Sequence, residues 1–178
     1  MKIIKEWKEL RRENIFSKYG RNMDKVIFEL PNSKEADFYL RDRGKRVAAV
    51  LAFTKNNEII LAKQFRPGPK KILLELPGGM IDDNETPIEG AKREFLEESG
   101  YTGDLEFVGE SVISAYSEAI KYNFIAKNCY KVQETSDTDK EITEVVLMKI
   151  DEFKKHLRSG QLSDIETAYL GLDYLKLL

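Results

Sequence analysis

The sequence contains one cysteine, one histidine and one tryptophan among its 178 residues. With Cys129 alone no internal disulfide can form, which suits a reducing compartment, so we expect a cytoplasmic protein. The single histidine, His156, follows two lysines in a segment expected to be helical, and it is expected at the surface. Catalytic triads and zinc sites that depend on histidine therefore have no basis in this chain.

The sequence also lacks a long hydrophobic run and an excess of charge of one sign. The N-terminal segment MKIIKEWKELRR has no apolar core long enough for a signal peptide, and no segment could span a membrane. Lysine and arginine number 29 against 31 aspartates and glutamates, which gives no broad signal for nucleic-acid binding. We expect neither a membrane nor a nucleic acid as partner, and the length suits a single domain with a full core.

A helix is predicted between Thr86 and Gly100. Thr86 is a favourable N-cap, Pro87 suits the first helical position, and Glu89 completes a T-x-x-E capping box. Gly100 supplies the usual stop. Three apolar residues recur at helical spacing and predict a face toward a core: Ile88, Ala91 and Phe95.

Three glutamates, Glu94, Glu97 and Glu98, lie on a different face of the same helix. Residues three and four apart are helix neighbours, so these carboxylates repel one another. Arg93 can pair with Glu97 but cannot neutralise all three. A hard divalent cation could, because Mg²⁺ prefers oxygen ligands such as carboxylates. The alternative is a solvated acidic helix face without function.

The longer pattern favours the functional interpretation. It reads G-x5-E-x7-R-E-φ-x-E-E-x-G-φ, where φ is apolar or aromatic, and it resembles the box of the Nudix hydrolases, which act on nucleoside diphosphates linked to another group. The residues that fit it are Gly79, Glu85, Arg93, Glu94, Phe95, Glu97, Glu98, Gly100 and Tyr101.

Short apolar runs separated by turn residues predict several strands. Before the helix these are Val26–Leu30 and Ala36–Leu40, joined by a turn at 31–33, then a buried strand at Val47–Phe53, its hairpin partner Ile59–Phe65, a loop at 66–71, and Ile72–Leu76 ending in a glycine turn at 77–79. After the helix they are Leu105–Val108, Ser111–Ala115, Tyr122–Ala126 and Ile142–Ile150.

Two further helices are expected near the C-terminus. Asp151 is expected to N-cap a short helix that ends at Gly160. Ser163 and Glu166 form a second capping-box pattern that opens a C-terminal helix, with Ile165, Leu172 and Leu175 among its apolar residues. The polar segment Gln133–Glu141 is either a flexible connection or a lid that carries a catalytic acid or base.

The segments QFR at 64–66 and ELPGG at 75–79 extend the resemblance to the ADP-ribose pyrophosphatase branch of the Nudix family. That resemblance implies an α+β fold, a Nudix-like α/β/α sandwich with a mixed central sheet. It also implies an N-terminal β-hairpin extension at residues 1–45 that packs across a homodimer, and a catalytic domain at residues 46–178.

The resemblance also implies a site. Glu94, Glu97, Glu98 and the Gly78 carbonyl match the metal ligands, for Mg²⁺ or alternatively Mn²⁺. Arg93 and Glu85 match residues that orient the loop and helix. Arg66 matches an arginine that contacts the substrate, and Glu75, in the ELPGG segment, is also expected to bind the substrate. The catalytic base is expected from the acidic loop, with Glu141 first and Asp139 and Glu144 behind it.

A proline that is typical of the branch after its box is missing from the stretch 111–118, although Ser117-Glu118 still resembles the pair that contacts the terminal ribose. This leaves ADP-ribose and other nucleoside diphosphate sugars open as substrates. Trp7 or Phe38 could stack on the base, or Trp7 could simply pack at the domain edge. Two other functions stay open: a sensor that binds a nucleotide sugar without cleaving it, and an RNA-processing enzyme, which would need a basic groove.

Overall fold

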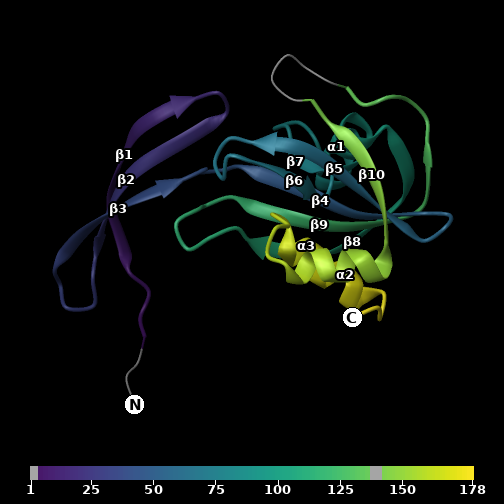
Figure 1. The fold of residues 1–178 in the computed structure, drawn as a ribbon. Coiled ribbons are helices and arrows are strands. Elements are labelled where there is room, and N and C mark those ends of the chain that lie inside the picture. Colours follow the sequence, from purple (N-terminus) through teal and green to yellow (C-terminus); the bar gives the residue numbers. More distant parts are fainter. Residues whose placement is uncertain (1–3, 137–141) are drawn as a thin grey trace. The chain divides into compact units, whose positions relative to one another are not determined.

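The computed structural model describes residues 4–136 and 142–178. The chain forms two compact units (Figure 1). Unit 1 comprises Met1–Lys45 and Val112–Ile120, and unit 2 comprises Arg46–Ser111 and Lys121–Leu178. No helix in the described parts of the chain is long and apolar enough to cross a membrane.

Unit 1 is built on a three-stranded antiparallel sheet of β1 (Lys8–Lys18), β2 (Arg21–Glu29) and β3 (Glu35–Arg41). The predicted hairpin is confirmed as β2–β3, and Ser33 in its turn has a φ of 60°. Strand β1 was not predicted. Its residues KELRRENIFSK are exposed at nearly every position, so they carry no alternation of apolar and polar residues that would reveal a strand.

Unit 2 contains a seven-stranded mixed sheet with the order β10-β5-β4-β9-β8, in which β6 pairs with β5 and β7 with β4. The strands are β4 (Arg46–Thr54), β5 (Glu58–Arg66), β6 (Lys71–Glu75), β7 (Gly78–Met80), β8 (Tyr101–Val112), β9 (Ile120–Lys131) and β10 (Glu144–Lys149). The predicted buried strand and its hairpin partner are confirmed as β4 and β5. Every residue of β4 from Ala48 to Phe53 is buried, as the continuous apolar run indicates.

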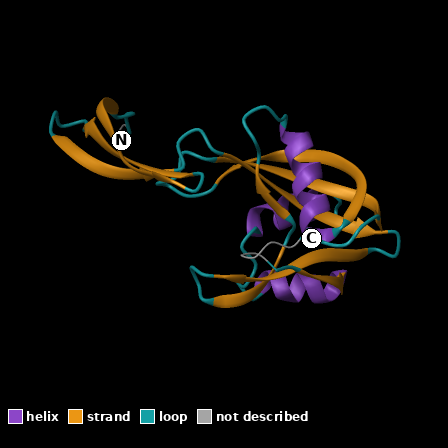
Figure 2. Cartoon of the chain, turned by 90° about the horizontal axis from the view of Figure 1, so that it is seen from above, coloured by secondary structure: helices purple, strands orange, loops and turns teal. Residues whose placement is uncertain are grey.

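Helices cover both faces of this sheet (Figures 1 and 2). On one face, Ala91 and Phe95 of α1 (Pro87–Ser99) pack against a cluster that includes Val50 of β4. On the other, Phe153 of α2 (Ile150–Arg158) and Leu172 of α3 (Ile165–Tyr174) join a second cluster. Alternate residues of β4 point into the two clusters because successive side chains of a strand leave opposite faces. The expected α/β/α sandwich is confirmed.

In unit 2 the predicted strands after the helix differ from the structure in their bounds, and one short strand was missed. Ser111–Ala115 is not a separate strand, because Ser111 and Val112 are the end of β8 and the chain then leaves unit 2. Leu105–Val108 is confirmed as strand, although β8 extends beyond it at both ends. The three-residue β7 was not predicted at all, because a G-G-M sequence has no apolar pattern.

The predicted caps of the last two helices were also wrong. Lys149 is the N-cap of α2, and Asp151 lies inside its first turn. Asp164, not Ser163, is the N-cap of α3, and Glu166 pairs with the Nζ of Lys121 at 2.6 Å instead of closing a capping box. Glu166 therefore forms an ion pair with Lys121 of β9 in place of the predicted capping-box contact within α3.

Two of the scarce residue types have defined places. His156, expected at the surface, is partly buried, and its Nε2 lies 2.9 Å from the carbonyl oxygen of Leu74, to which the protonated ring nitrogen can donate a hydrogen bond. Cys129 is a free, buried thiol whose pKa burial raises to about 12.

Candidate active site

The carboxylate helix α1 begins and ends where its sequence predicts. The capping box at Thr86 is present, with the Thr86 N–H donating to the Glu89 carboxylate at 2.8 Å. Gly100 has a φ of 71°, and its N–H donates to the Leu96 carbonyl at 2.8 Å. The caps define where the helix starts and stops, and the packing of Ala91 and Phe95 on the core sets the direction in which its glutamates point.

The core-facing side of α1 differs from the prediction at one position. Ala91 and Phe95 are buried, but Ile88 is 37% exposed. Gly90 is buried on this side of the helix instead, and a Cβ at that position would lie only 2.9 Å from the Ile81 side chain. The helix therefore packs more closely on the preceding loop than a side chain at position 90 would allow.

Arg93 is the hub of the acidic face. Its Nε and Nη2 donate to the Glu85 carboxylate at 2.7 and 2.9 Å, and Nη2 also donates to the Met80 carbonyl at 2.8 Å. Its Nη1 donates to Glu94 at 2.8 Å and to Glu97 at 3.3 Å. The guanidinium lowers the pKa of Glu85 to about 2. One arginine thus orders the loop between β7 and α1 and offsets part of the repulsion between the glutamates.

The two glycines of β7 lie directly beside two of the carboxylates. A Cβ on Gly79 would stand 2.3 Å from Glu94 Oε2, so this glycine makes room for the carboxylate. The N–H of Gly78 donates to Glu98 Oε2 at 2.9 Å. Gly78 itself is required by the fold, because a Cβ there would stand 2.2 Å from the carbonyl oxygen of Ala48 on β4.

Glu98 is the most strongly perturbed group of this face. Burial raises its pKa to about 7, against the opposing effects of the Gly78 N–H, Arg66 and Gln64. Burial also raises the pKa of Glu94, although Arg93 opposes this shift. A partly desolvated carboxylate beside others is costly to ionise, and a bound cation would remove that cost.

Arg66 and Glu75 are neighbours, as sequence positions on adjacent strands suggest. They are not register partners, because Lys71 opposes Arg66 and Ala62 opposes Glu75, but the Arg66 side chain reaches along the pair of strands so that its Nε lies 2.5 Å from Glu75 Oε2. Glu75 is 2% exposed, whereas about a third of the Arg66 side chain is accessible. The buried carboxylate therefore fixes an arginine that can still meet an anionic ligand.

The donor set fits a divalent cation of the hard, oxygen-preferring kind. Three carboxylates share one helix face, and two of them lie against a glycine turn where a side chain would fill the space. Over the described residues no three acidic, histidine or cysteine side chains already converge on one point. Arg93, bound to Glu94 and Glu97, supplies their counter-charge in the present arrangement.

The remaining predicted substrate residues belong to unit 1. Trp7 and Phe38 lie together, with ring centroids 5.3 Å apart, and both contact Phe28. These rings line a cavity of about 330 Å³ with Ala115 and Tyr116 among the other lining residues. Trp7 is 46% exposed, so part of this residue is accessible to a ligand.

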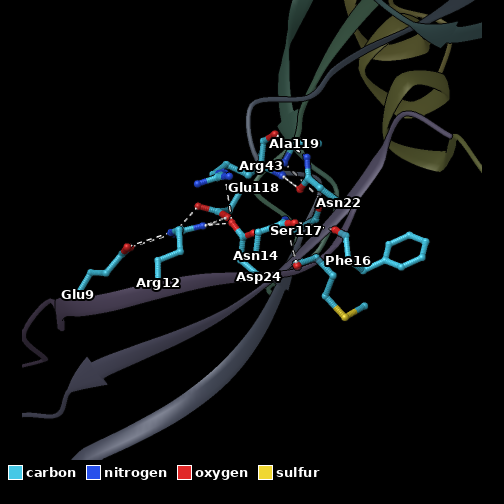
Figure 3. Close-up of polar contacts among 11 residues, drawn as sticks. Glu9, Arg12, Asn14, Phe16, Asn22, Asp24, Arg43, Ser117, Glu118 and Ala119 are labelled. Atoms are coloured by element: carbon cyan, nitrogen blue, oxygen red, sulfur yellow. Dashed lines mark hydrogen bonds and ion pairs between the residues drawn. The ribbon is translucent and has the colours of Figure 1, made fainter. Parts of the chain in front are cut away.

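Ser117 and Glu118 are also held within unit 1. The Ser117 hydroxyl lies 3.3 Å from the Asp42 carboxylate. Both Glu118 carboxylate oxygens accept from Arg12, at 2.7 and 3.0 Å (Figure 3). Arg12 was not singled out in the sequence, because it is one charged residue among many in β1.

The predicted base Glu141 and its alternative Asp139 lie outside the described residues. The third choice, Glu144, begins β10 and pairs with Lys63 at 2.7 Å. Before the residues that are not described, the Ser136 N–H donates to the Glu97 carbonyl at 2.8 Å. The Thr135 hydroxyl donates to the Thr143 carbonyl at 3.4 Å. Ser136 is thus held beside the C-terminal part of α1, and Thr135 lies close to Thr143 on the other flank of the loop.

One contact of the site was missed in the sequence and has a readable signal. Gln64 is buried, and its Nε2 lies 3.4 Å from Glu98 Oε1. A polar residue inside the otherwise apolar strand Ile59–Phe65 requires a partner once it is buried. That interruption could have marked Gln64 as a neighbour of the site.

Comparison with known proteins agrees with this geometry. A model of the NUDIX domain matches residues 43–165. An ADP-ribose pyrophosphatase of Bacillus subtilis is 31% identical over 182 residues, which cover 99% of this chain and 96% of that protein. A methanol dehydrogenase activator of Bacillus methanolicus is 27% identical over 97% of this chain and 94% of its own. A crystal structure of an ADP compounds hydrolase superposes with a TM-score of 0.82 at 18% identity, covering 99% of this chain and 97% of that one.

The chain belongs to the Nudix family. It is a Nudix hydrolase related to pyrophosphatases of nucleoside diphosphate sugars, and hydrolases of this family use divalent metal ions.

Proposed function

We propose that the protein hydrolyses the pyrophosphate bond of ADP-ribose, or of a related nucleoside diphosphate sugar, with Mg²⁺ as the metal. The products are a nucleoside monophosphate and a sugar phosphate, AMP and ribose 5-phosphate in the case of ADP-ribose. The observation that carries the proposal is the set of three carboxylates on α1, two of them seated against the glycines of β7. The relative from Bacillus subtilis, an ADP-ribose pyrophosphatase, supports the choice of substrate.

The chemistry follows from the charge of the substrate. A pyrophosphate linkage is anionic and resists attack by water. Glu94, Glu97, Glu98 and the Gly78 carbonyl would hold the metal, and Mg²⁺ bound there would offset this charge and polarise a phosphorus. Arg66, held by the buried Glu75, supplies a fixed cation for a phosphate oxygen.

The chain's own residues also prepare the attacking water. A carboxylate of the acidic loop takes its proton, which contributes about 10²–10⁴-fold to the rate. We assign this role to Glu141, with Asp139 and then Glu144 as the alternatives. The hydrogen bond from the Ser136 N–H to the Glu97 carbonyl of α1, and the contact between Thr135 and Thr143, support a base from this loop.

The aromatic cavity of unit 1 suits the base of the substrate. Trp7 is partly exposed, and its ring contacts Phe28 and Phe38. Stacking of a base on an aromatic ring contributes about 1–3 kcal/mol and tolerates any base. We therefore place the nucleoside on Trp7, with Phe38 as the supporting ring.

We also propose a homodimer formed through unit 1. Val26 and Ala119 are its buried apolar residues within the described chain, whereas Phe16, Tyr19 and Tyr39 are at least half exposed. A three-stranded sheet needs an apolar face covered to be stable. A second copy of the same sheet would supply that cover. Light scattering at micromolar concentration should give twice the chain mass, and a monomeric mass would contradict the assignment.

The function is tested by incubating the protein with Mg²⁺ and a panel of substrates, with products read by chromatography. The panel contains ADP-ribose, ADP-glucose, GDP-mannose, NADH, diadenosine polyphosphates and 8-oxo-dGTP. AMP with ribose 5-phosphate, formed fastest from ADP-ribose, is the expected result. Faster cleavage of another sugar nucleotide would change the substrate and keep the mechanism. Tight binding without cleavage of any compound would overturn hydrolysis in favour of a sensor.

The matched variants are Glu98→Gln and Glu110→Gln. Glu98→Gln should abolish turnover while circular dichroism stays native. Glu110 is an exposed glutamate on β8, and its variant should keep wild-type turnover. Full activity of Glu98→Gln in the presence of Mg²⁺ would refute the metal assignment.

A further inference from the structure

A cavity of about 460 Å³ lies in unit 2, between the turn that joins β4 to β5 and the residues that follow α3. Sites for small molecules are typically concave spaces of about 300–1,000 Å³ with an apolar lining and a few fixed polar groups. The cavity therefore has the size of a ligand site, and its lining indicates the chemistry of the ligand.

The apolar part of the lining belongs to the core of unit 2. Phe53, near the end of β4, is 6% exposed and is a member of the core cluster that α2 and α3 cover. Ile150, Leu175 and Leu177 are partly buried and pack against the same cluster. The glutamates of the candidate active site belong to α1, which packs on the opposite face of the sheet (Figure 1). The cavity is therefore separate from that site.

The polar part of the lining comes from two segments that lie apart in the chain. Lys55 and Asn57 belong to the turn after β4, whereas Lys127 and Asn128 belong to β9. Among the described lining residues two are lysines and none is acidic. An apolar wall beside cationic groups suits a molecule that has an apolar part and an anionic group.

Lys55 is the cation that an anionic group can meet. Its Nζ lies 5.8 Å from the ring centroid of Tyr130, and no carboxylate of the described chain forms an ion pair with it. Lys127 differs, because its Nζ lies 2.9 Å from Glu106, which also accepts from the Tyr174 hydroxyl at 2.9 Å. One uncompensated positive charge matches a carboxylate better than a phosphate group, which carries about two negative charges at neutral pH.

The backbone that carries Lys55 is held in place by Thr54. The Asn57 N–H donates to the Thr54 carbonyl at 3.0 Å, and the N–H groups of Asn56 and Glu58 donate to the Thr54 hydroxyl at 3.2 Å each. The turn is thus ordered before a ligand arrives. An ordered site loses less conformational entropy on binding than a flexible one, so this order favours affinity.

We propose that this cavity binds a small monocarboxylate with an apolar tail. The tail lies against Phe53, Leu175 and Leu177, where burial of apolar surface stabilises it, and the carboxylate meets Lys55, with Lys127 nearby. The ligand is neither the substrate nor a product of the proposed hydrolysis. The site therefore stands independently of the proposed function.

The test uses octanoate as the probe, with octanol as its neutral counterpart and octylamine, a cation at neutral pH, as its opposite. Amide NMR spectra of isotope-labelled protein locate the binding, and calorimetry gives the Kd. The variants are Lys55→Met and Lys55→Glu, both at an exposed turn position. The matched control is Lys131→Met, because Lys131 is an exposed lysine of β9 that pairs with Glu134 and does not line the cavity. Thermal unfolding checks each fold.

We expect octanoate to shift the amide signals of residues 54–58, 127–128 and 175–177. Octanol should bind more weakly and octylamine should not bind. Lys55→Met should raise the Kd of octanoate about two- to fivefold, because an ion pair open to solvent contributes modestly. Lys55→Glu should raise the Kd further, since it replaces attraction with repulsion, and Lys131→Met should match the wild type.

Three results would overturn the site. The first is the absence of binding at millimolar octanoate, or signal shifts confined to α1 or to unit 1. The second is equal affinity for octanol and octanoate, which would show an apolar cavity without preference for an anion. The third is a Kd that the Lys55 variants leave unchanged, or that Lys131→Met raises equally. None of these measurements uses turnover, so a failure of the proposed function would leave the outcome unaffected.

Discussion

Replacing Glu98 with glutamine should stabilise the protein at alkaline pH when divalent metal is removed by EDTA. The carboxyl titrates near 4.5 in the unfolded chain and near 7 in the folded protein. Between these values the folded protein binds more protons than the unfolded chain, so the free energy of unfolding falls as pH rises. The cost is absent below about pH 4.5 and complete above about pH 7.

The gap between the two pKa values corresponds to about 3 kcal/mol of unfolding free energy. Glutamine never ionises, and its Oε1 can still accept the Gly78 N–H. At pH 8 the variant should therefore exceed the wild type by up to about 3 kcal/mol, or about 6–12 °C in Tm for a domain of this size. At pH 4 the two proteins should be nearly equal.

The assay is urea unfolding followed by circular dichroism from pH 4 to pH 8, in EDTA, for the wild type, Glu98→Gln and the exposed control Glu110→Gln. A stability difference that does not change with pH would refute the reasoning, as would a control that behaves like Glu98→Gln. Adding Mg²⁺ at a hundred times its Kd should then stabilise the wild type by about 2.7 kcal/mol and leave Glu98→Gln unchanged.

Three further predictions concern the same unit. Gly78→Ala should lower Tm more than Gly79→Ala, because a Cβ at position 78 meets the backbone of β4 whereas a Cβ at position 79 meets the movable carboxylate of Glu94. Gly79→Ala should stay folded and bind Mg²⁺ more weakly, as measured by calorimetry. Arg93→Lys should lower the free energy of unfolding in urea by about 1–3 kcal/mol, because lysine cannot replace the two hydrogen bonds to Glu85. If the stability losses of Arg93→Lys and Glu85→Gln simply add in the double variant, this explanation is contradicted. Cys129 should react with a thiol reagent at pH 8 only after unfolding, because burial raises its pKa to about 12, and rapid labelling of native protein would disprove its burial.

Local signals in the sequence determined the carboxylate helix and the two strands β4 and β5 of the central sheet. The capping box at Thr86 and the left-handed Gly100 depend only on neighbouring residues, so the ends of α1 could be read directly. The continuous apolar run at 47–53 likewise predicted a fully buried strand. The fixed spacing of the glutamates on one helix face was enough to indicate the family, which the comparisons confirm.

The tertiary structure decided what depends on residues distant in the chain. Nothing near Glu166 announces that it pairs with Lys121, and nothing near Glu118 announces Arg12, which is 106 residues away. Strand β1 has an exposed, charged sequence and exists through its pairing with β2, so its own pattern could not reveal it. Local propensity fixes helix ends and buried runs, whereas ion pairs, edge strands and the burial that perturbs Glu98 arise only when the chain is folded.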